Sequence, residues 1–81
     1  MQTNTSHHYR SESGIDNPVD DQLYDLLQAL TSKCEALEAY AKYEQDADGE
    51  TRQLFQQLGR DDAEHARQLL DALRSKLNGS Q

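Results

Sequence analysis

Apolar residues recur along the first half of this chain at alternating steps of four and three, which defines one face of a helix. The residues are Leu23, Leu27, Leu30, Cys34, Leu37 and Ala41. Side chains with this spacing fall on one side of an α-helix with about 3.6 residues per turn. The pattern predicts an amphipathic helix over residues 18–45. Asn17 would cap its start, and the missing N–H of Pro18 costs nothing in a first turn.

A second helix is predicted after a short turn. Residues 46–49 are Asp-Ala-Asp-Gly, which favour a turn, and the following helix should span residues 50–77. Asn78 and Gly79 are typical residues at which a helix stops. The expected fold class is all-α, with an antiparallel two-helix hairpin at residues 18–78. We expect a polar, disordered tail at residues 1–17 and a short C-terminal tail at residues 79–81.

The chain is too small to build a substantial core alone. It has 81 residues and one cysteine, Cys34, so no disulfide can form within one copy. Two helices can bury only their facing seam, and two hairpins together make a four-helix bundle. We therefore expect a homodimer or a larger homo-oligomer. Cys34 is expected on the seam as a small buried hydrophobic residue.

Composition limits the classes of partner and compartment. The net charge of −7 argues against binding to nucleic acid or to an anionic membrane surface. No apolar run approaches the length of a membrane span, and the N-terminus lacks the apolar core of a signal peptide. A single thiol on an apolar helical face suits a reducing compartment. These features predict a cytoplasmic protein.

Two ionisable residues interrupt the apolar stripe of the second helix. The stripe consists of Phe55, Leu58, Leu69, Ala72 and Leu73. Asp62 lies at its centre and His65 near its edge, one above the other on the same side of the helix. Such groups are costly to bury unless they pair, form hydrogen bonds or bind a cation. Two interpretations stay open: a metal-ligand pair on the wall of a bundle, or a hydrogen-bonded pair that sets helix register.

The expected hairpin register adds carboxylates to this pair. A turn near Asp48 sets Asp62 level with Glu35, and Glu38 lies one turn closer to the turn. By helical angle, Glu38 flanks the apolar stripe, whereas Glu35 points away from it and would face a partner subunit. The candidate metal ligands are therefore Glu38, Asp62, His65 and Glu35. One hairpin offers too few donors, so the site is expected at a dimer interface. Carboxylates with a few histidines suit iron, manganese or zinc.

The same residues carry a resemblance to a known family. The stretch Glu35–Asp48, the pair Leu54-Phe55 and the stretch Asp61–Ala66 resemble the ferritin-like superfamily. The sequence looks most like the short, one-hairpin encapsulated ferritins, and more distantly like rubrerythrin, over about residues 30–77. Ala39 and Tyr43 match an alanine and a tyrosine of the family's first helix, and His65 matches the histidine of its Glu-x-x-His motif in the second helix. Asp62 stands where the family has the glutamate of Glu-x-x-His.

The resemblance implies a di-iron centre that forms when hairpins dimerise and that oxidises ferrous iron for storage or detoxification. It also implies a shell protein of the encapsulin type as a partner, and so a place inside a protein nanocompartment. Glu35 and Glu38 match carboxylates of an outer metal site in encapsulated ferritins. Ala36 departs from the family, since it occupies the position of the metal-bridging glutamate. Ala36 favours an alternative function, a metal-free hairpin interaction module that has lost the centre.

Overall fold

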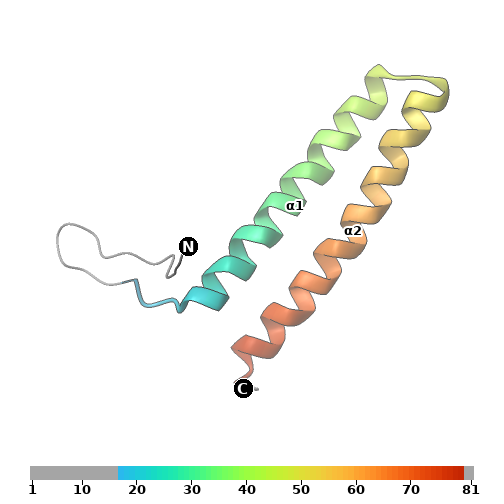
Figure 1. Ribbon diagram of the computed structural model, residues 1–81. Coiled ribbons are helices and arrows are strands. Elements are labelled where there is room, and N and C mark those ends of the chain that lie inside the picture. The colour runs from blue at the N-terminus through green and yellow to red at the C-terminus, as the bar shows by residue number, and fades with distance from the viewer. Residues whose placement is uncertain (1–16, 80–81) are drawn as a thin grey trace, which may run out of the picture.

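The computed structural model describes residues 17–79 as a hairpin of two long antiparallel helices (Figure 1). Helix α1 spans Asp21–Asp46, and helix α2 spans Gly49–Leu77. They lie side by side, so that the start of α1 is next to the end of α2. The described residues contain no strand, and the predicted all-α hairpin is confirmed. The expected tails lie, apart from Asn17 and Gly79, outside the described residues.

Helix α1 begins at Asp21 and not at Pro18, so the predicted start is wrong. Asp20 is the N-cap, and its Oδ1 accepts a hydrogen bond from the backbone N–H of Leu23 at 2.8 Å. Asn17 instead accepts from the N–H of Val19 at 3.0 Å, which closes a turn ahead of the helix. A carboxylate at the N-cap satisfies a free N–H and also interacts favourably with the helix dipole. Asp20 is therefore the stronger cap.

Helix α2 has ends close to those predicted. It starts at Gly49, whose φ of +54° lies in the left-handed region that glycine adopts without strain. At the other end, the backbone N–H of Asn78 donates to the carbonyl of Arg74 at 2.9 Å, and Gly79 follows with a φ of +76°. Positive side chains in the last turn, from Arg74 and Lys76, complement the carbonyl end of the helix dipole.

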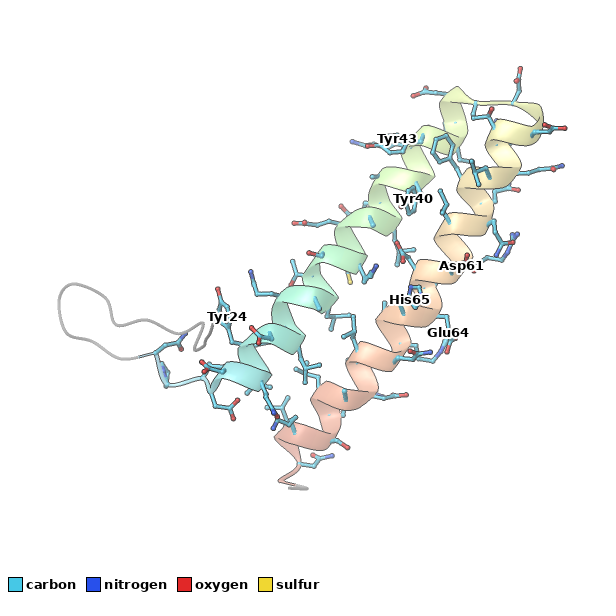
Figure 2. All side chains as sticks on the ribbon, in the orientation of Figure 1. Tyr24, Tyr40, Tyr43, Asp61, Glu64 and His65 are labelled. Carbon is cyan, nitrogen blue, oxygen red and sulfur yellow. The ribbon has the colours of Figure 1, made fainter. Side chains whose placement is uncertain are left out.

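Contacts at both ends of the hairpin hold the helices in register. Near the turn, the ring of Tyr40 stacks on Phe55 with centroids 6.2 Å apart, and Tyr43 lies 5.5 Å from the same ring. At the open end, Lys76 Nζ donates to Gln22 Oε1 at 2.6 Å. Figure 2 labels Tyr40 and Tyr43 near the turn end of α1. Aromatic packing closes one end, and a polar contact closes the other.

Helix α2 covers one side of the apolar stripe of α1, on which Leu23, Leu30 and Leu37 are partly buried. Three further residues of α1, seven positions apart, are partly buried along this side: Leu26, Lys33 and Tyr40. Their next neighbours in the sequence are exposed: Leu27, Cys34 and Ala41, here called the open line. The prediction that Cys34 is buried on the seam is therefore wrong. A stripe this wide exceeds what a single neighbouring helix can cover, and the open line lies beyond its reach.

Burial within one hairpin is slight. Leu73, at 8% exposure, is the one buried residue among those described. Other leucines stay largely in solvent, with Leu54 at 55% and Leu77 at 64% exposure. Neither α1 nor α2 has the apolar length that crossing a lipid bilayer requires. The core of one hairpin is a narrow strip along the seam.

Candidate functional site

The centre of the seam contains an ionic cluster formed by Lys33, Asp62 and His65, here called the Asp62 cluster. Lys33 extends from α1, and Asp62 and His65 lie one turn apart on α2. Lys33 Nζ donates to Asp62 Oδ1 at 3.1 Å, and His65 Nδ1 lies 3.0 Å from the same oxygen. The carboxylate side chain is only 15% exposed. One carboxylate oxygen is therefore shared by two nitrogen groups.

The two neighbours stabilise the ionised form of Asp62. The hydrogen bond from His65, followed by that from Lys33, lowers the pKa of the Asp62 carboxyl below its ordinary value, and partial burial opposes this. The side chains of Lys33 and His65 are 37% and 53% exposed. The Lys33 ammonium and the His65 imidazole therefore remain in contact with water, and the cluster lies at the solvent-exposed edge of the seam.

Sequence reasoning placed Asp62 beside His65 but missed Lys33. The structure brings Asp62 and His65 together because residues three apart share one side of a helix. The expected register set Asp62 level with Glu35, whereas the observed partner is Lys33, two positions earlier. A long, flexible lysine side chain can reach a carboxylate on a facing helix while its ammonium stays near water. The sequence feature that could have indicated this contact is the position of Lys33 on the edge of the α1 stripe, nearly level with Asp62 in the expected register.

Glu35 and Glu38 do not join this cluster in the hairpin. Both are exposed and line a shallow depression of α1 together with Ala39, Lys42 and Tyr43. Helical phase turns this part of α1 away from α2. Among residues 17–79, no three His, Cys, Asp or Glu side chains come close enough to hold a metal ion. A single hairpin thus keeps Glu35 and Glu38 away from the Asp62–His65 pair.

The Asp62–His65 pair by itself fits two positions around a metal ion. Two ligands at a right angle and about 2.1 Å from an octahedral metal lie about 3.0 Å apart, and 3.0 Å is also the ordinary length of an N–H···O hydrogen bond, which is the contact observed here. Lys33 opposes such binding, because its ammonium occupies the same carboxylate oxygen and would repel a cation. The hairpin therefore offers two donors, and a metal would have to displace Lys33 and gain further ligands from another molecule.

Comparisons with protein-family models, curated proteins and solved structures found no match to this chain. The similarity to ferritin-like proteins thus stands on the motif residues alone. In that pattern Ala36 is the position that lacks a metal-binding side chain.

Proposed function

We propose that this chain is a metal-free helical-hairpin module that self-associates, with two copies packing into a four-helix bundle. One observation carries the proposal: a single residue, Leu73, is buried in the described part of the hairpin. Small domains need oligomerisation or another source of stability when their own core is thin. A second copy offers a matching apolar surface and can cover the exposed leucines of the first.

The Asp62 cluster has a specific role in such a module. Polar pairs at helix interfaces select one alignment, because other alignments leave a charged group without its partner. A slip of α1 by one turn, about 5.4 Å, would carry the Lys33 ammonium out of reach of Asp62. The cluster thus supplies the cation that a partly buried carboxylate needs, and it fixes which residues of the hairpin face outward.

Sedimentation equilibrium and thermal melting test this proposal. We expect a dimer in which the melting temperature rises with protein concentration, because association stabilises the folded state by mass action. The untagged full chain should be used, with helicity followed by circular dichroism. A folded monomer at the highest attainable concentration, with a melt independent of concentration, would contradict the proposal.

The second candidate function is ferritin-like metal binding, with iron as the first choice and manganese or zinc as alternatives. The juxtaposition of an oxygen donor of Asp62 and a nitrogen donor of His65 on one side of α2 is the observation that supports it. Asp62 and His65 would be ligands from one copy, and Glu38 and Glu35 would have to come from another. Ferrous iron would then be the substrate of a ferroxidase, with dioxygen accepting the electrons. This candidate implies an encapsulin-type shell protein as partner and a cytoplasmic nanocompartment as location.

Metal titration separates the two candidates. In the metal-binding case, ferrous iron raises the melting temperature of the wild type, His65→Ala abolishes that shift, and Lys33→Gln enlarges it by removing the competing ammonium. In the metal-free case, none of the three proteins responds to iron, manganese or zinc. Elemental analysis of untagged protein after purification provides an independent measurement of bound metal.

A further inference from the structure

We infer that the second copy docks on the open line of α1, antiparallel to it, about a two-fold axis that passes next to Cys34. This inference rests on the proposed self-association and adds the face and the orientation. The open line consists of Leu27, Cys34 and Ala41, which are exposed although they continue the apolar stripe of α1. Their seven-residue spacing keeps them on one side along the whole helix.

Helix α2 extends this face with two alanines and a leucine. Helical phase in an antiparallel pair places Ala63, Ala66 and Leu70 on the same side of the hairpin as the open line. Ala63 is exposed, and Ala66 and Leu70 are partly buried. Alanines let the backbone of a neighbouring helix approach closely. The face is therefore formed by both helices and not by α1 alone.

The area of this face is large enough for a stable dimer. Helix α1 has 26 residues, which gives a length of about 39 Å at 1.5 Å per residue. Two adjacent helices, each about 10 Å wide, present roughly 780 Å² on one side. Stable protein dimers of standard size bury about 800 Å² on each partner. The face of one hairpin thus matches the surface that one partner contributes.

The residues along the open line favour the antiparallel orientation. Cys34 lies next to the midpoint of α1 (Asp21–Asp46), so a two-fold axis there sets Leu27 opposite Ala41 of the second copy. A large side chain then faces a small one at both ends of the interface. A parallel pairing would crowd two leucines at one end and leave a gap between two alanines at the other. Antiparallel helix dipoles also attract one another.

The charge of Glu38 also favours the antiparallel orientation. Glu38 lies at the margin of the open line and is exposed. In the antiparallel pairing Glu38 is level with Leu30 of the second copy, whereas a parallel pairing would set the two Glu38 carboxylates side by side. Like charges at an interface oppose association. His65 lies on the other face of the hairpin by helical phase, so this dimer leaves the Asp62 cluster outside the interface.

Oxidative crosslinking of the native thiol tests the position of the axis. Each disulfide forms from two Cys34 thiols, which give up two protons and two electrons to added diamide. We expect the wild type to crosslink at least tenfold faster than a matched control, Cys34→Ser with Ser32→Cys. Ser32 is also exposed and lies near the same level of α1, but on nearly the opposite side. Equal rates for the two proteins would overturn the inference.

Exchange of the large and small residues tests the orientation. Leu27→Ala and Ala41→Leu should each weaken the dimer at least tenfold, because one leaves gaps and the other crowds two leucines. The double variant restores a leucine opposite an alanine in the antiparallel pairing, and it should recover the wild-type dissociation constant to within about threefold. In a parallel pairing Ala41→Leu alone would fill the gap between two alanines and strengthen the dimer, so its weakening effect identifies the antiparallel orientation. Circular dichroism verifies that each variant keeps its helices. No recovery in the double variant contradicts the inference.

The outcomes separate this inference from the proposed function. A wild-type dimer with crosslinking at Cys34 and recovery in the double variant supports both. A wild-type dimer without selective crosslinking rejects the open line as the interface and leaves self-association standing. A protein that remains monomeric in sedimentation rejects both.

Discussion

Lys33 on α1 and Asp62 on α2 are joined by an ion pair of 3.1 Å across the seam of the hairpin. This ion pair compensates the charge of a carboxylate that lies within the apolar stripe of α2. The compensating cation belongs to the chain itself, and a bound metal is not needed to balance the carboxylate. The pair also couples the two helices, because its members come from opposite sides of the turn.

Replacement of Lys33 by Gln should destabilise the hairpin. The variant leaves Asp62 with His65 alone, and we expect a decrease of a few degrees in melting temperature, small because Lys33 is 37% exposed. Lys42→Gln is the matched control, since Lys42 is exposed on the outer side of α1. Differential scanning calorimetry at one fixed protein concentration measures both. An equal loss in the two variants would show that the ion pair does not stabilise the fold.

The free energy of unfolding should decrease at low pH because the Asp62 carboxylate becomes protonated. Its neighbours lower the pKa of the Asp62 carboxyl in the folded chain, so the stabilisation is present above the unfolded value of about 3.9. It is lost as the pH decreases through the lower, folded value. Urea denaturation between roughly pH 5 and pH 2 should therefore show a decline that Asp62→Asn reduces. Asp61→Asn is the control and should keep the decline, because Asp62 is intact.

Truncation of Leu73 should be the most damaging apolar change. Leu73 is the buried residue of the described chain, and Leu73→Ala removes contacts worth about 2–3 kcal/mol from a very small core. We expect this variant to lose most of its helicity at 37 °C by circular dichroism. Leu77→Ala, at a position that is 64% exposed, should change stability by less than about 0.5 kcal/mol. Comparable losses for the two variants would show that the seam is not the core.

Gly59 offers a stabilising substitution inside α2. A Cβ added there meets no atom within 4 Å, so Gly59→Ala should gain about 1 kcal/mol from helix propensity. The gain corresponds to about 4–8 °C in melting temperature for a domain of this size. Gly49→Ala is the informative contrast: its surroundings are equally open, but its φ of +54° strains any other residue. Thermal melts at low protein concentration should show opposite signs for the two variants.

The amino-acid sequence by itself determined the local features of this protein. Helix periodicity and turn residues predicted two helices and the break between them, and three-residue spacing placed Asp62 beside His65. These features depend on neighbours within one or two turns. The tertiary structure decided which edge of the α1 stripe faces α2, and hence that Cys34 is exposed and that Lys33 meets Asp62. The observed seam keeps Leu23, Leu30 and Leu37 and exchanges the open line for Leu26, Lys33 and Tyr40. This exchange corresponds to a rotation of α1 by about 50° from the expected seam. That angle is set by side-chain packing between the two helices, which the periodicity of either helix alone does not specify.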